Sequence, residues 1–383
     1  MFIGEYREGG KPLPRVLHLS VARYRVELPR PGEPLEFLVT IHEEGTGISW
    51  QQNVTVEHET QQYLLEATSV LNECALNWAT ALDQAVDTAR QLGERLHDTF
   101  FGPAGSKVLD AVVSTAILLD VDETILNLPW ELLGPPGRVL SQETPFGRLV
   151  TTRTIPARGR DPVQEDTVVR FLVVANPTQD LANIELEVKA LRELEGRHDG
   201  FSVETTVLSG KQATRSNVYE SLASGDFDVL HFSGHAALDA DHPGDSAVRL
   251  ADGYLSADDI VRIPWQRPPG LVFSSACESG RGVAGHRLLS ADRQANGLAA
   301  AFLSAGVYAY AGFFWPVTDT GAALFTRAFY ESLFMEENVG LAFLAARQRA
   351  IQDLGAFGDL AGYSAVLFGD AASKHRRDTF SAQ

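Results

Sequence analysis

Apolar and polar residues alternate along three short stretches within residues 14–57, a pattern typical of β-strands with one buried face. The turn-forming segments PRPGEP and EEGTG separate these stretches, so the pattern predicts a small antiparallel sheet. From Thr60 to about Phe101 the apolar residues recur every three or four positions instead, which predicts helix. Cys74 lies on this apolar stripe, where we expect a small buried side chain rather than a reactive thiol.

The segment from Phe101 to Gly105 breaks the helical pattern and is rich in glycine and proline. We therefore predict a domain boundary here, with a β-plus-helix domain at residues 1–104 and a second domain at 105–383. In the second domain, apolar runs occur at 116–122, 170–177, 201–208, 227–235, 270–277, 307–315 and 363–368. Amphipathic helical patterns occupy most of the intervals, at 183–197, 213–224, 294–305, 319–335 and 339–354. This alternation predicts an α/β fold whose mostly parallel sheet has helices on both faces.

Composition narrows the functional classes. The 383 residues are 44% hydrophobic and 21% charged, as in ordinary globular proteins, and the net charge of -18 argues against nucleic acid as the main ligand. Two cysteines cannot form a disulfide framework and the first residues do not resemble a secretory signal, so we expect a cytoplasmic protein. Residues 294–318 carry no charge, but Gly306 and Pro316 divide the run, so we predict a buried helix and strand, with no membrane partner.

Two of the apolar runs end in residues that carry chemistry. His235 ends the run at 227–235, and Cys277 ends the run at 270–277. In a parallel sheet the carboxyl ends of the strands lie at one edge, so neighbouring strands would bring imidazole and thiol together. An imidazole can hold a thiol as thiolate, which is the nucleophilic form. A cysteine at a strand end is also often part of the core, and this pattern by itself leaves both interpretations open.

Further segments make the chain resemble a known family from about residue 105 to 370. The matching segments, in order, are LPWELL at 128–133, VVANP at 173–177, DVLHFSGH at 228–235, SACESG at 275–280, AAFLSAG at 300–306, WPV at 315–317 and LFGD at 367–370. They resemble the CHAT domain, a caspase-like cysteine peptidase family related to separase in the caspase and gingipain clan. The resemblance implies a caspase-like fold with Cys277 as nucleophile and His235 as general base. It also implies an oxyanion site formed by the backbone N–H groups of Ala236 and Cys277.

Several neighbouring residues have competing interpretations. For substrate binding the candidates are Glu278, Trp315 and Asp319, with structural roles as the alternative: loop hydrogen bonding, core packing and capping of the helix that follows, respectively. His231 lies within an apolar strand, so we expect a structural histidine. Metacaspase-like relatives carry an aspartate at the position of Ser275, so a basic P1 preference does not follow.

The polar segment with His235, Asp239, Asp241 and His242 matches no metal-binding spacing, and no nucleotide-binding motif is present. We therefore expect neither a metal nor another cofactor.

The resemblance thus implies a cysteine endopeptidase that cleaves one dedicated protein substrate in response to an activating partner or ligand, and proteins encoded nearby are the candidate substrates. The resemblance implies bacterial defence or cell-death signalling, for example activation of a gasdermin. Residues 1–104 are then a hypothetical sensing or recruiting domain, and the Gly- and Arg-rich residues 280–293 a hypothetical gate or self-cleavage site. The alternatives are a catalytically silent CHAT-fold scaffold and, less favoured by the distant cysteines, a redox protein.

Overall fold

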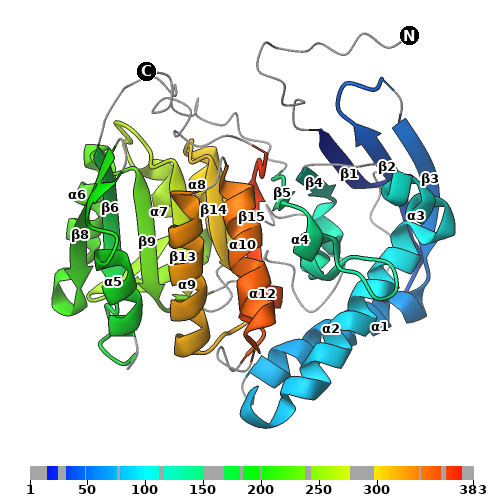
Figure 1. Ribbon diagram of the computed structural model, residues 1–383, viewed down its shortest axis with the longest axis horizontal. Helices are drawn as coiled ribbons and strands as arrows, with labels where there is room; N and C mark the ends of the chain where they lie inside the picture. Colours follow the sequence, from blue (N-terminus) through cyan, green and yellow to red (C-terminus); the bar gives the residue numbers. More distant parts are fainter. Residues whose placement is uncertain are drawn as a thin grey trace.

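A computed structural model describes residues 15–24, 32–47, 49–75, 78–111, 116–150, 168–181, 184–198, 201–237, 243–276, 297–335, 338–354 and 359–372 (Figure 1). Their main feature is a 12-stranded sheet in the order β3-β2-β1-β4-β5-β15-β14-β13-β9-β6-β8-β7. Helices cover both faces of its larger half. The predicted α/β class, with a mostly parallel sheet between helices, is confirmed.

The N-terminal strands form an antiparallel meander, as the alternating pattern predicted. The strands are β1 (Val16–Arg23), β2 (Leu35–Glu43) and β3 (Ser49–Val56). The long helices α1 (His58–Ala75) and α2 (Trp78–Phe100) pack against their apolar side, and the short α3 (Gly102–Ala111) follows. Cys74 is buried among these residues, and burial raises the pKa of its thiol, so the structural interpretation of Cys74 is confirmed.

β1 also pairs in parallel with β4 (Ala116–Val121), so the meander and the rest of the sheet are continuous. The strands on the two sides of residue 104 therefore belong to one sheet. The division into two domains at this residue stays a prediction.

The larger half of the sheet is built from parallel strands that the apolar runs predicted. They are β6 (Val168–Ala175), β8 (Phe201–Ser209), β9 (Val229–Gly234), β13 (Leu271–Ala276) and β14 (Ala309–Phe313). β15 (Ala365–Gly369) runs antiparallel to β14, and the three-residue β7 (Gly196–His198) runs antiparallel to β8. Every residue of β9 and β13 is buried, which explains why the two strands, apart from His231, consist of apolar or small residues.

Two hydrophobic cores lie on opposite faces of these strands. One face packs against α5 (Ile184–Arg192), α9 (Asp319–Leu333) and α10 (Val339–Gln352), in front of the sheet in Figure 1. The other packs against α6 (Arg215–Ser224), α7 (Ala257–Arg262) and α8 (Gly297–Ser304). The uncharged run at 294–318 accordingly contains a buried helix and a buried strand, as predicted. Within the described ranges, no helix combines the length and apolar character needed to cross a bilayer.

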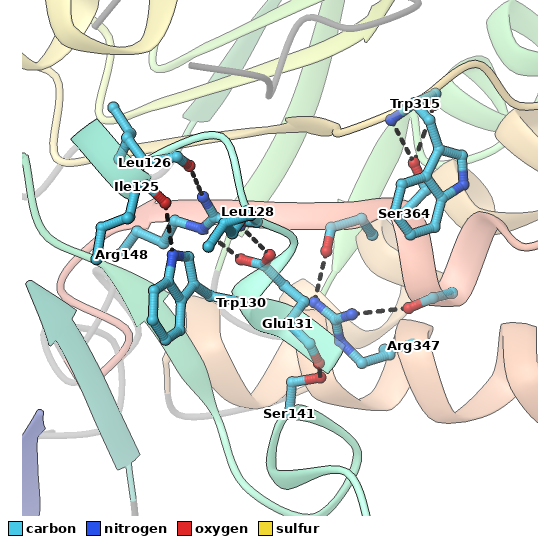
Figure 2. A network of polar contacts seen from close by, with 12 residues as sticks. Ile125, Leu126, Leu128, Trp130, Glu131, Ser141, Arg148, Trp315, Arg347 and Ser364 are labelled. Carbon is cyan, nitrogen blue, oxygen red and sulfur yellow. Dashed lines mark hydrogen bonds and ion pairs between the residues drawn. The ribbon is translucent and has the colours of Figure 1, made fainter. Parts of the chain in front are cut away.

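A buried polar network joins the middle of the sheet to the short 3-10 helices η1 (Glu123–Ile125) and η2 (Trp130–Leu132), which follow β4 (Figure 2). Arg148, on β5 (Phe146–Arg148), donates to both carboxylate oxygens of Glu131 and to the carbonyls of Leu126 and Leu128. Arg347, on α10, donates to two carbonyls at α12 (Ala361–Ser364) and β15. The indole of Trp130 donates to the Ile125 carbonyl at 3.0 Å.

Because Glu131, Arg148 and Arg347 are all at most 2% exposed, the LPWELL segment has a structural role in this protein. The short α4 (Leu140–Glu143) lies beside it, where the Ser141 hydroxyl donates to the Glu131 carbonyl at 2.6 Å.

A small second sheet follows β9. Its strands are β10 (Ala236–Ala237), β11 (Ala247–Leu250) and β12 (Gly253–Ser256), all antiparallel. The 3-10 helix η4 (Pro243–Asp245) precedes β11, and η3 (Gly210–Gln212) follows β8. This sheet continues directly from His235 and so fixes the backbone on its carboxyl side.

Candidate active site

The candidate site lies where the winding of the sheet reverses. From β6 the chain passes through α5 to β8 on one side, and then through α6 to β9 on the other side of β6. The two helices pack on opposite faces, and in open α/β sheets such a reversal marks the carboxyl edge at which ligands generally bind. Asn176 follows β6, and His235 follows β9, so both belong to this edge.

The His235 side chain is 37% exposed and is held on one side by a carboxylate. Its Nε2 lies 3.0 Å from Oδ1 of Asp180, which comes from the loop after β6. The hydroxyl of Thr178 donates to the same oxygen. These two hydrogen bonds, Thr178 first and His235 second, hold the pKa of Asp180 below its usual value, so the carboxylate is ionised at neutral pH.

The ionised state of Asp180 assigns the proton on the imidazole. A carboxylate can only accept, so Nε2 of His235 carries the hydrogen of this bond. In the neutral ring Nδ1 is then the nitrogen that can accept a proton, which is what a general base requires. Asp180 is not among the site residues predicted from the sequence.

The Asp180 loop is a tightly bonded turn. The backbone N–H of Asn176 donates to the Ser233 carbonyl on β9 at 2.8 Å. Its side-chain Oδ1 accepts from the backbone N–H groups of Asp180 and Leu181 at 3.2 and 3.3 Å, and its Nδ2 donates to the Leu181 carbonyl at 2.8 Å. Asn176 and Gln179 have φ values of 44° and 58°, the left-handed region that residues other than glycine seldom adopt. The sequence thus closes this turn against β9, two residues before His235.

Cys277 and Glu278 lie outside the described residues, so the predicted meeting of thiol and imidazole stays a prediction. What the structure gives is the register of the two strands that precede them. β9 and β13 pair in parallel, with Ser275 beside Ser233 and Ala276 beside Gly234. His235 is the next residue after Gly234, and Cys277 is the next residue after Ala276.

The backbone N–H of Ala236 points away from the ladder that this residue forms with β11. The carbonyl of His235 accepts from the N–H of Arg249 at 2.8 Å, and Ala236 is paired with Val248. In an antiparallel ladder this makes Ala236 and Val248 a pair without mutual hydrogen bonds, so the N–H of Ala236 is directed away from β11. It therefore remains a candidate for the oxyanion site.

A fully buried polar cluster lies under the same strand ends. Glu187 of α5 accepts hydrogen bonds from Ser233 and Thr326, and His231 lies 2.8 Å from the Ser233 hydroxyl and 3.2 Å from the hydroxyl of Tyr330. Burial would raise the pKa of Glu187, but hydrogen bonds and charge from His231, with hydrogen bonds from Ser233 and Ser275, lower it. Burial, followed by the charge of Glu187, raises the pKa of Tyr330 well above its usual value. His231 is therefore a buried structural histidine, as predicted.

The other candidate residues have clear positions. Trp315 is fully buried, with its backbone bonded to Ser364, so we assign it to the core instead of a substrate-binding surface. Asp319 is partly exposed and is the first residue of α9. The expected capping role belongs instead to Thr318, whose hydroxyl accepts from the N–H of Gly321 at 2.9 Å, because Asp319 already lies within the helix.

A pocket of about 890 Å³ borders the outer side of the Asp180 loop. Asn176 and Gln179 line it from the loop, while Lys189 and Arg192 of α5 and Lys211 of η3 contribute cations. Glu185 and Glu193 line it as well, so its charges alone select no ligand. Among the side chains described by the structure, no group of three or more His, Cys, Asp or Glu is arranged to hold a metal ion; Asp239, Asp241 and His242 lie outside that part of the chain.

Comparisons with known proteins agree with this architecture. A family model described as CHAT domain matches residues 90–359. Two crystal structures of the Saccharomyces cerevisiae separase–securin complex are similar, with TM-scores of 0.60 and 0.56 and 12% identity. Each match covers 92% of this chain and 30% of the other, so this chain spans under a third of the length of the protein it matches.

A crystal structure of the Arg-specific cysteine proteinase gingipain R also matches, with a TM-score of 0.46 and 14% identity over 76% of this chain and 68% of that one. No curated protein matches the sequence. At such low identity the separase likeness shows the fold alone, and that fold is the caspase-like arrangement which the sequence motifs predicted.

Proposed function

The chain belongs to the CHAT domain family, and from this membership and the geometry of His235 we propose that it is a cysteine endopeptidase. One observation carries the proposal. The His235 imidazole stands at the carboxyl end of β9 with Nε2 bonded to Asp180, and β9 pairs with the strand that directly precedes Cys277. This leaves Nδ1 to exchange a proton with a thiol.

In the proposed reaction His235 takes the proton of the Cys277 thiol, and the thiolate attacks the carbonyl carbon of a peptide bond. The negative charge that develops on the carbonyl oxygen is stabilised by the backbone N–H groups of Ala236 and Cys277. When the tetrahedral intermediate collapses, His235 gives its proton to the leaving amine and a thioester remains. Water, deprotonated by His235, then attacks the thioester, which releases the carboxylic acid and restores the thiol.

The substrate that we propose is one dedicated protein, cleaved at a defined site. α9 follows β14, so its first residue, Asp319, lies near the carboxyl edge of the sheet. The partly exposed carboxylate of Asp319 can add negative charge to a substrate-binding groove there. Glu278 remains a second candidate. Bacterial defence or cell-death signalling, with gasdermin activation as one example, stays the setting implied by the family resemblance.

A catalytically silent scaffold with the same fold is the alternative, and the reactivity of Cys277 separates the two. An unperturbed thiol with a pKa of about 8.5 is only a few per cent ionised at pH 7. An imidazolium partner would make most of it thiolate, so iodoacetamide should modify Cys277 up to about thirtyfold faster than it modifies a free cysteine peptide. His235→Ala should abolish this advantage.

Mass spectrometry of peptides containing Cys277 gives the rate directly. Cys74 is a poor reference, because its burial slows alkylation whether the protein is a peptidase or a scaffold. A wild-type rate equal to that of the free peptide, unchanged in His235→Ala, would favour the scaffold.

A further inference from the structure

We propose that Asp180 is a positioning residue that holds the His235 imidazole in its catalytic tautomer and stabilises its charged form. The inference deepens the proposed function and rests on it, since an orienting carboxylate matters only where His235 exchanges protons. It starts from one contact, the 3.0 Å hydrogen bond between Nε2 of His235 and Oδ1 of Asp180. No sequence motif that carries the family resemblance includes Asp180.

The contact fixes which nitrogen is available for chemistry. With Nε2 donating to an ionised carboxylate, a neutral His235 presents Nδ1 as its acceptor. When Nδ1 takes the thiol proton, the ring becomes a cation directly beside a full negative charge. Asp180 therefore favours the imidazolium and thiolate pair over the neutral imidazole and thiol pair. A buried aspartate has this role in serine proteases, where its replacement by asparagine leaves the imidazole in the wrong tautomer and lowers the rate about 10⁴-fold.

An exposed ion pair usually contributes little, because two flexible side chains must be held together. The Asp180 loop removes most of that cost. The Asn176 side-chain amide bonds the far end of the turn, at Asp180 and Leu181. Its backbone N–H anchors the turn to β9, and the Thr178 hydroxyl holds the Asp180 carboxylate itself. Left-handed conformations at Asn176 and Gln179 cost free energy, so these bonds must define the turn strongly. Asp180 is thereby fixed relative to the strand that carries His235.

The expected effect is smaller than in a buried triad. The Asp180 side chain is 55% exposed, so water screens its charge. We expect Asp180→Asn to slow iodoacetamide modification of Cys277 about three- to tenfold at pH 7, well below the 10⁴-fold of the buried case. At pH 9.5 an ordinary thiol is ionised without help. There the rates of the variant and wild type should converge to within about twofold.

The pH dependence separates positioning from a merely structural role. A distorted site would react slowly at both pH values, whereas loss of thiolate stabilisation matters only below the pKa of a free thiol. Asp226→Asn is the matched control. It removes the same charge from an exposed turn before β9, at the opposite edge of the sheet, and should leave the rates unchanged. Asn176→Ala, which keeps the carboxylate but loses the bonds that hold the turn, should act in the same direction as Asp180→Asn.

The outcomes separate this inference from the proposed function. If wild-type Cys277 is no more reactive than a free thiol and His235→Ala changes nothing, the proposed peptidase mechanism fails. If His235→Ala slows modification while Asp180→Asn behaves like Asp226→Asn at pH 7, only the role of Asp180 is overturned. Equal slowing by Asp180→Asn at pH 7 and 9.5 would also overturn it, since that is the signature of a distorted site.

Discussion

Replacing Glu131 with glutamine should destabilise the protein strongly, because the network in Figure 2 holds two buried guanidiniums around one buried carboxylate. The side chains of Arg148 and Glu131 are 0% and 2% exposed, and Arg148 forms hydrogen bonds with both Glu131 oxygens. Burial lowers the pKa of Arg347 to about 10, while the charge of Glu131 opposes this decrease and that of Arg148 adds to it. Arg347 is therefore still a cation at neutral pH and depends on the same carboxylate.

The magnitude follows from the charges that each variant leaves behind. Removing one partner of a buried ion pair typically costs about 3–5 kcal/mol. Glu131→Gln leaves two buried guanidiniums and no carboxylate, so we expect a loss of this size. Arg148→Met also leaves the Leu126 and Leu128 carbonyls without their donor, yet Glu131 can still balance Arg347.

A double-mutant cycle tests this reasoning more sharply than either single variant. In the Arg148→Met background, Glu131→Gln leaves only one buried guanidinium, that of Arg347, without a carboxylate to balance its charge. It should therefore cost at least about 1.5 kcal/mol less there than in the wild type, within the usual range for coupled neighbours. The assay is urea unfolding followed by tryptophan fluorescence, since Trp130 lies in the network. Additivity of the two substitutions within about 0.5 kcal/mol would refute the shared-carboxylate interpretation.

Two further predictions concern stability. Gly93→Ala places a methyl group where α2 meets the Leu132 carbonyl oxygen. It should destabilise the protein by about 1–3 kcal/mol, although alanine by itself favours a helix by roughly 1 kcal/mol over glycine. A gain in the urea midpoint would contradict this. Burial raises the pKa of Asp359, although hydrogen bonds from Thr318 and Ala361 oppose the increase. The stability that the Asp359 carboxyl contributes is therefore fully present below about pH 4 and is lost as the pH rises through the raised pKa. The penalty of Asp359→Asn should thus be smaller at pH 7 than at pH 4, and a pH-independent penalty would argue against the burial.

The long elements could be predicted because burial on both faces leaves an unmistakable pattern. β9 and β13 are buried at every position, and apart from His231 their sequences are runs of apolar or small residues. The three-residue β5 and β7 were missed, since three residues carry no period. β5 also contains Arg148, a charge that by pattern alone indicates an exposed position, although it is completely buried by its bonds to Glu131 and two carbonyls.

The site could be predicted only in part. His235 was identified because it ends a strand in a sheet whose carboxyl edge carries the chemistry. Asp180 was missed because Asn-Pro-Thr-Gln-Asp has the composition of any turn, and its partner lies 55 residues away. A usable signal existed, since this turn follows an apolar run and so reaches the same edge. Glu187 offered another, because it occupies a buried position of α5 between Ile184 and Leu191, where a charge needs a specific partner.

The central claim, proteolysis through Cys277 and His235, is tested most directly by cleavage of a protein substrate. Purified wild type, Cys277→Ala and His235→Ala should each be incubated with the proteins encoded beside this chain, and new termini identified by mass spectrometry. We predict cleavage at one or a few defined peptide bonds by the wild type and none by either variant. Cleavage at the same bonds that persists in Cys277→Ala would contradict it.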